Sequence, residues 1–301
     1  MFKLLSKESN IFSIPVYILF LLLVITAFNV LNFSLLESIS AGVAFLGISL
    51  VYFVFNPMNL TYQTHVPLFL YTFFIFGFYP ENMDLGLSVS LLTNSFLLLV
   101  LSSTEDQVRK RSYLLVGAFL AVNYLFLPTT WPMLIFVVMH IIATSRQIAL
   151  NLFRLVFGIV LVFFAYFCLM YTIGFTTFNA DYLPIDLGPV RRDFSSLYSL
   201  VPVVVLLVYA VLDHFNHFNE KSPDSRFKYT FLLIFVMAQL TTIVLYMGEH
   251  HQYLMLMAFP ASVILSRMLR FLPNYWMKEL GLWLIIGCML AFKVLNYFQL
   301  F

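Results

Sequence analysis

Residues 109–146 read RKRSYLLVGAFLAVNYLFLPTTWPMLIFVVMHIIATSR. Between the basic residues at the two ends of this run, positions 112–145 hold no Asp, Glu, Lys or Arg. About 20 apolar residues cross the roughly 30 Å hydrocarbon core of a bilayer, so the run has room for two helices. Pro128 and Pro132 stand between them, where one helix ends and the next begins. The run therefore predicts a transmembrane hairpin whose two basic ends lie on the same side of a membrane.

Long uncharged runs of this kind fill the rest of the chain. Of the 301 residues, 62% are hydrophobic and only 10% are charged, against roughly 25% charged residues in a soluble domain. We predict an all-α protein, a polytopic transmembrane helix bundle of about eleven helices, which forms a single transmembrane domain over residues 1–301 with no separate soluble domain. The helices are expected within 9–36, 38–80 (two, broken near 56–65), 85–104, 112–145 (two), 155–176, 197–212, 229–248, 252–266 and 280–300.

The basic residues give this bundle a direction. If the N-terminus lies in the cytoplasm, thirteen of the sixteen Lys and Arg residues fall on the cytoplasmic side, as the positive-inside rule requires. Only Arg191 and Arg192 fall in an outer loop, and Lys293 lies in the last helix, close enough to its outer end to snorkel. We therefore predict a cytoplasmic N-terminus, a periplasmic C-terminus and a multi-pass location in the bacterial inner (cytoplasmic) membrane.

Polar residues are scarce in the middle of the predicted spans. The main interruptions are Asn94, Asn123, His140 and Gln239, each of which we expect to form a hydrogen bond between helices. No Asp, Glu or Arg lies near the middle of a span. Proton-driven motors and ion-coupled pumps generally need an intramembrane carboxylate, so its absence from the sequence argues against that class of protein.

The outer turn between the spans 229–248 and 252–266 carries Glu249, His250 and His251. A carboxylate beside two imidazoles is a candidate for acid–base catalysis or for holding a sugar or a phosphate. Adjacent histidines on a helix diverge by about 100°, so they rarely bind one metal together. The alternative is a polar turn at the level of the lipid headgroups.

The outer loop that follows residue 176 contains Arg191 and Arg192. Two arginines can bind a lipid phosphate or a pyrophosphate, or they can pair with nearby acids of the outer face. Glu37 lies at the first outer turn and is a further acid of this outer face. The candidate catalytic residues are therefore Glu37, Glu249, His250 and His251, and the candidate phosphate- or lipid-binding residues are Arg191 and Arg192.

On the inner side, His214 and His217 have a spacing that a metal tolerates, but no further ligand accompanies them. Zinc-protease, nucleophile-elbow and phosphate-loop motifs are absent from the sequence. We therefore expect no metal site, no cofactor and no nucleic-acid partner.

The order of the segments carries a resemblance. It rests on the inner loop at Asn59, the basic loop 109–111, the hairpin at 127–132 and the sequence AFPASV at 258–263. Taken together, these resemble a family of polytopic inner-membrane proteins of unknown function from Bacteroidota. The arrangement is also distantly similar to the membrane part of GT-C glycosyltransferases, which use polyprenyl-phosphate sugars. That similarity implies a catalytic acid in the first outer loop, which Glu37 matches by position.

The sequence is compatible with three functions. Short loops, few intramembrane charges and 35 Phe and 17 Tyr residues suit a non-enzymatic subunit of a membrane complex in cell-envelope assembly or export, in contact with the lipid bilayer and other membrane subunits. The first alternative is a GT-C-like enzyme or carrier that handles a polyprenyl-linked glycan at the outer leaflet. The second alternative is a transporter, although the sequence has no visible repeats and no midplane binding groups.

Overall fold

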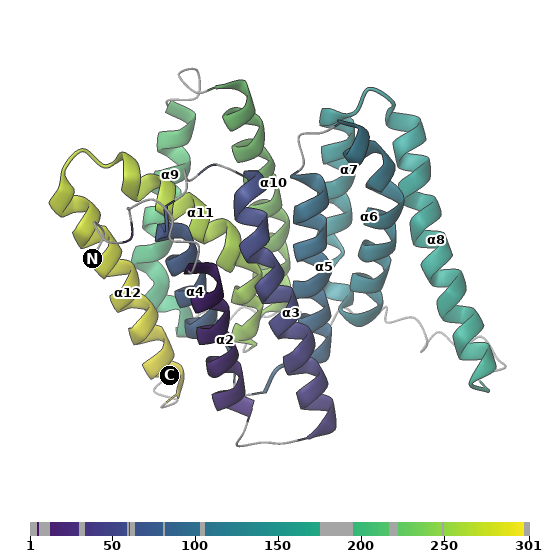
Figure 1. Ribbon diagram of the computed structural model, residues 1–301, viewed down its shortest axis with the longest axis horizontal. Helices are drawn as coiled ribbons and strands as arrows, with labels where there is room; N and C mark the ends of the chain where they lie inside the picture. The colour runs from purple at the N-terminus through teal and green to yellow at the C-terminus, as the bar shows by residue number, and fades with distance from the viewer. Residues whose placement is uncertain are drawn as a thin grey trace.

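The computed structural model of the chain describes Leu5, Leu60 and residues 13–29, 34–58, 64–80, 82–102, 106–174, 195–216, 222–248 and 250–297. This part of the chain contains eleven α-helices and no extended strand, which confirms the predicted fold class (Figure 1). The helices are α2 (Ser13–Asn29), α3 (Leu35–Met58), α4 (Val66–Phe78), α5 (Leu85–Leu101), α6 (Asp106–Phe126), α7 (Pro132–Thr144), α8 (Ile148–Thr172), α9 (Val201–Asn216), α10 (Pro223–Tyr246), α11 (Met255–Phe271) and α12 (Tyr275–Tyr297).

The breaks between helices lie where the sequence predicts them. The run 38–80 is divided between α3, which ends at Met58, and α4, which begins at Val66. The hairpin divides at a short 3-10 turn, Pro128–Thr130, between α6 and α7. Pro132 then opens α7, at a position where its missing N–H removes no helical hydrogen bond.

Six of the described helical segments are long and apolar enough to cross a membrane: Leu35–Phe55, Ile148–Thr172, Leu197–Asn216, Pro223–Tyr246, His251–Phe271 and Tyr275–Asn296. The chain is therefore a multi-pass membrane protein. Its turns alternate between the two ends of the bundle, and the end that holds the α7–α8, α9–α10 and α11–α12 connections is at the top of Figure 1. The basic residues Arg146, Arg226 and Arg270 lie at or next to these connections, so we name this end the inner end and the opposite end the outer end.

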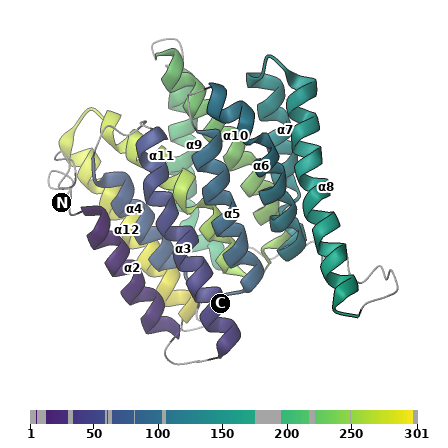
Figure 2. The ribbon, with the colours of Figure 1, turned by 45° about the vertical axis from the view of Figure 1, so that its right-hand side comes forward.

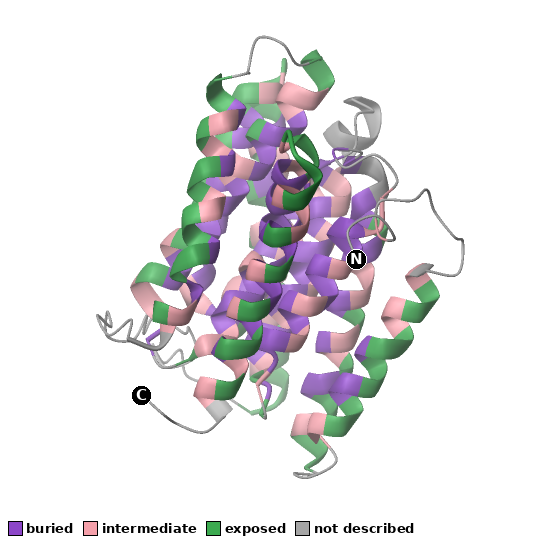
Figure 3. Cartoon of the chain, turned by 90° about the vertical axis from the view of Figure 1, so that its left-hand side faces the viewer, coloured by how far each residue is buried: buried purple, intermediate pink, exposed green. Residues whose placement is uncertain are grey.

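The helices differ sharply in how much protein surrounds them. Ten of the thirteen residues of α4 and thirteen of the seventeen residues of α11 are buried, whereas only three of the twenty-five residues of α8 are. Purple, buried segments gather at the centre of the bundle in Figure 3 and green, exposed faces point outward. The helix α4 is about 20 Å long, shorter than the bilayer core, and this length is tolerated because other helices surround it.

Two close helix crossings depend on glycine. A Cβ at Gly47 of α3 would lie 2.7 Å from the backbone nitrogen of Leu92 in α5. A Cβ at Gly117 of α6 or at Gly158 of α8 would overlap the carbonyl oxygen of Leu155 or of Leu114, respectively. Small residues at such crossings allow the two backbones to approach, which is how transmembrane helices gain packing contacts.

Candidate functional site at the outer end

A lysine of the last helix closes the outer end of α4. The Nζ atom of Lys293 donates a hydrogen bond of 2.6 Å to the carbonyl oxygen of Tyr79, the residue that caps α4. The same ammonium lies 4.4 Å from the centre of the Phe28 ring. A cation at a helix C-terminus satisfies an orphan carbonyl and interacts favourably with the helix dipole. The sequence predicts that Lys293 snorkels toward the outer surface; in the structure its ammonium reaches the outer end of α4 and caps that helix.

Further contacts extend this cap into a group of side chains from four elements. The amide of Asn29 in α2 donates to the Tyr79 hydroxyl over 3.1 Å. The ring of Phe292 meets both Phe78, at 5.6 Å, and His251, at 5.9 Å. We call Asn29, Tyr79, His251, Phe292 and Lys293 the outer cluster. It joins α2, α4, α12 and the 3-10 turn His251–Leu254.

Two more hydrogen bonds at the outer end join the α6–α7 hairpin to α10 and to the 3-10 turn His251–Leu254. The indole nitrogen of Trp131 donates to the hydroxyl of Tyr246 over 3.0 Å. The hydroxyls of Thr129 and Tyr253 lie 3.2 Å apart. Tyrosine and tryptophan suit this depth because each has an apolar body and a polar group that finds a partner.

The structure gives Glu37 a local role. The hydroxyl of Ser34 accepts a hydrogen bond of 3.1 Å from the backbone N–H of Glu37. This places the two residues at the first and fourth positions of a capping box, the S-x-x-E pattern that begins many helices. A carboxylate in the first turn of α3 also interacts favourably with the helix dipole. Capping thus accounts for an acid at this position.

The two adjacent histidines lie in different environments. His250 is exposed, while His251 is half-buried with its ring edge-on to Phe292. No group of three or more His, Cys, Asp and Glu side chains in the described residues is placed to hold a metal ion. The remaining candidates, Glu249, Arg191 and Arg192, lie outside the described residues.

The four polar interruptions of the spans are all buried, with exposures of 5% for Asn94, 1% for Asn123, 3% for His140 and 0% for Gln239. Gln239 of α10 donates to the sulfur of Met133 in α7 over 3.0 Å, which is a contact between helices as expected. The amide of Asn94 instead donates a hydrogen bond within α5, to the hydroxyl of Ser90 at 3.4 Å. His140 packs edge-on against Phe231 at 5.2 Å.

A second group of side chains lies at the inner end. His214 of α9 stacks on the ring of Tyr229 in α10, with centroids 3.7 Å apart. Arg267 of α11 lies 5.2 Å over the same ring and donates to Ser225 over 3.1 Å. His214 is therefore a packing residue in the described structure, and His217 lies outside the described residues.

The outer cluster offers one ammonium and one imidazole among aromatic rings, a set that suits anchoring of helices. Sequence reasoning missed Tyr79 and gave Lys293 no partner. The signal for Lys293 was present, because it is the only charged residue between Gly281 and Leu300. Its partner could not be found from the sequence, since Tyr79 is 214 positions away.

Comparison with known proteins identifies a family to which the chain is similar. Residues 1–301 match the family described as "Family of unknown function (DUF6427)". No curated protein and no solved structure matches the chain.

Proposed function

The chain belongs to the DUF6427 family of unknown function, and we propose that it serves as a non-enzymatic subunit of a membrane complex. The setting we propose is cell-envelope assembly or export in the bacterial inner membrane. This setting rests on the resemblance of the sequence to a family of inner-membrane proteins from Bacteroidota. The supporting observation is the outward face of α8, at the edge of the bundle in Figures 1 and 2.

The buried residues of α8 lie on one side of the helix only. They are Asn151, Leu155 and Gly158, which face the crossing with α6. The opposite side carries a continuous ridge at i, i+4, i+7 and i+11. We call this side the α8 ridge: Phe153, Phe157, Val160 and Phe164, which are 65%, 45%, 54% and 67% exposed.

The α8 ridge has the features of a surface that receives a helix. The rings of Phe153 and Phe157 stack with centroids 6.0 Å apart. Ridges of side chains along i, i+4 rows pack into the grooves of a second helix, and aromatic residues are enriched where proteins meet. The occupant we propose is an apolar transmembrane helix of another subunit.

A photocrosslinking experiment tests this proposal. A photoreactive amino acid at position 157 should form a product with a different protein in native membranes, because the ridge faces the partner helix. The same amino acid at Val204, a 54% exposed residue of α9, provides the control and should give lipid adducts only. The double change Phe157→Ala and Phe164→Ala should remove the product and leave expression unchanged. A chain that forms no protein adduct at 157 and runs alone in mild detergent contradicts the proposal.

The second candidate function is a GT-C-like enzyme or carrier for a lipid-linked glycan. One observation favours it: an apolar cavity lies in the outer half of the bundle, where the tail of such a substrate would lie. The described residues that line this cavity do not include Glu37, His250 or His251, so these three catalytic candidates do not contribute to it. The subunit role therefore has the stronger support.

A further inference from the structure

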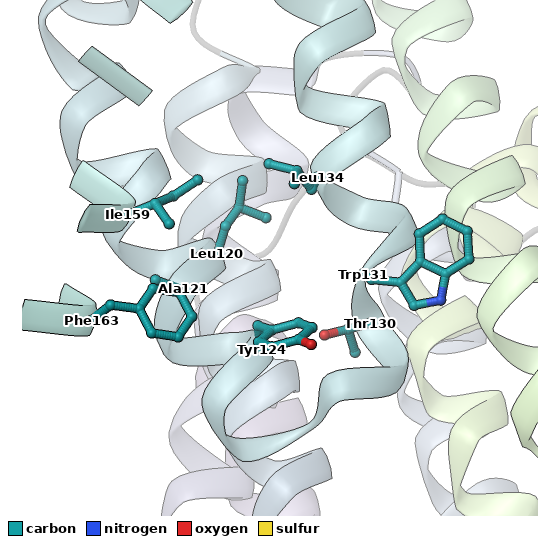
Figure 4. Close-up of a pocket in the computed structure, with 8 residues that line it drawn as sticks. All are labelled: Leu120, Ala121, Tyr124, Thr130, Trp131, Leu134, Ile159 and Phe163. Atoms are coloured by element: carbon teal, nitrogen blue, oxygen red, sulfur yellow. The ribbon is translucent and has the colours of Figure 1, made fainter. Parts of the chain in front are cut away.

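A cavity of about 280 Å³ lies between α6, the start of α7 and α8 (Figure 4). Leu120 and Ala121 of α6 form its floor, Leu134 of α7 forms one wall, and Ile159 and Phe163 of α8 form the other. The helices α7 and α8 are joined at the inner end and α8 leans away toward the outer end in Figures 1 and 2. The cavity occupies the space that this divergence leaves over α6.

The cavity lies at the depth of the outer lipid leaflet. Leu120 is six residues before Phe126, the last residue of α6, which corresponds to about 9 Å along the helix axis. Half of a bilayer core is about 15 Å thick. Leu134 at the edge of the cavity is 40% exposed, so the cavity reaches the surface that faces lipid.

The cavity lining includes the hydroxyl groups of Tyr124 and Thr130, both labelled in Figure 4. The Thr130 hydroxyl donates to the carbonyl of Leu127 over 2.7 Å, and the Trp131 indole N–H is directed to Tyr246. None of the eight lining residues is charged. A phosphate or sugar inside this space would lose its hydration with no charged partner in return.

We propose that the cavity binds one acyl chain of an outer-leaflet phospholipid. Its volume is about twice the ~150 Å³ of an apolar cavity that accommodates a benzene ring, which is enough for a segment of one hydrocarbon chain and too little for a whole lipid. An apolar cavity stays dry, so at this depth the hydrocarbon of the membrane fills it. The headgroup remains outside, on the side of Tyr124 and Thr130.

This site goes beyond the proposed subunit function and does not depend on it. Ile159 and Phe163 lie on the flank of α8, between its buried side and the α8 ridge, because successive helical residues are rotated by 100°. A partner helix on the ridge and an acyl chain in the cavity therefore occupy different faces.

Native mass spectrometry of the purified protein tests the site. The wild-type chain should retain one tightly held phospholipid through detergent exchange. Ala121→Phe and Ile159→Phe, which fill the cavity from α6 and α8, should each lower the retained fraction at least fivefold. Leu115→Phe places the same ring at a 53% exposed position of α6 and should retain the lipid. Melting curves establish that each variant is folded. Equal retention in all four proteins overturns the proposal, as does a polyprenyl phosphate in place of the phospholipid.

Tryptophan fluorescence provides an independent measurement in vesicles. Replacement of Trp276 and Trp283 by Phe leaves Trp131, which lines the cavity, as the only indole. Phospholipid brominated in its acyl chains should quench Trp131 with a saturable component at low mole fraction. Ile159→Phe should remove that component. Quenching that rises only in proportion to the brominated lipid, with or without Ile159→Phe, indicates annular lipid alone and overturns the proposal.

Discussion

The helices α4 and α8 are both strongly apolar, yet they have opposite positions in the bundle. The thirteen residues of α4 are almost enclosed by other helices, whereas the twenty-five residues of α8 lie at the edge with one narrow buried side. Hydropathy alone does not separate them. Their surroundings do: a helix of about 20 Å leaves its ends inside the hydrocarbon unless protein covers them, and α11 and α12 lie against α4.

The two helices are also held by different interactions. Lipid tails are as apolar as leucine, so the hydrophobic effect gives transmembrane helices little reason to associate. The helix α8 therefore depends on the close backbone crossing at Gly117 and Gly158. The helix α4 depends on its enclosure and on the cap that Lys293 provides.

The largest expected effect is on the attachment of α8. Gly158→Leu places a side chain where the backbone carbonyl of Leu114 lies, and backbone cannot move aside as a side chain can. We expect a loss of about 3 kcal/mol in the free energy that holds α8 against α6. The measurement is disulfide crosslinking between cysteines at the crossing, which should fall in the variant.

Gly42→Leu is the matched control, because a Cβ at Gly42 meets no atom within 4 Å. It should leave both crosslinking and the melting temperature unchanged. If Gly158→Leu crosslinks as well as the wild type, α8 is held by something other than this crossing, and the contrast with α4 fails.

A smaller effect is expected when the α4 cap is removed. Lys293→Met leaves the buried carbonyl of Tyr79 without this charged donor, which should cost about 2 kcal/mol of unfolding free energy. Lys278→Met removes a similar bond, Nζ to the carbonyl of Arg270 at 2.7 Å, in an exposed place. Water replaces that donor, so the expected loss is about 0.5 kcal/mol or less. Unfolding in a denaturing detergent series gives both values, and equal losses would show that burial of the α4 end is unimportant.

The smallest effect is expected at Gln239 in the centre. Its Nε2 atom contacts the sulfur of Met133, a weak acceptor, and its Oε1 atom has no hydrogen-bond partner in the described residues. Gln239→Leu removes a buried polar group and should leave the unfolding free energy within about 0.5 kcal/mol of the wild type or raise it by about 1 kcal/mol. A loss of more than 2 kcal/mol in the same detergent series would show that the amide stabilises the core.

The helix positions were predictable because each depends on the free-energy cost of placing nearby charged residues or prolines inside a membrane-spanning helix. Charged residues and prolines end the runs, and the breaks at Met58 and at Pro128 coincide with those signals. The depth of burial was not predictable in this way. Only the pairing of distant segments reveals that α4 is central, since its neighbours include α11 and α12 from the other end of the chain.

The candidate site was less predictable than the fold. Glu37 and His251 were chosen for their chemistry, and the structure places them in a helix cap and against Phe292. The sequence predicted only that the Lys293 ammonium reaches the outer surface. Its hydrogen-bond acceptor is the backbone carbonyl of Tyr79, and a backbone carbonyl carries no residue-specific signal in the sequence. The assignment of Arg191 and Arg192 to phosphate or lipid binding and of Glu249 to catalysis stays a prediction, since these residues lie outside the described residues.

The lysine cap on α4 has a consequence for biosynthesis. Tyr79 and Lys293 are 214 residues apart, and a ribosome that adds roughly 5–20 residues per second needs about 10–40 s to make the intervening chain. During that interval the short helix α4 has neither its cap nor its neighbours α11 and α12. We therefore expect the insertion machinery or a chaperone to shield α4 until α12 has been synthesised.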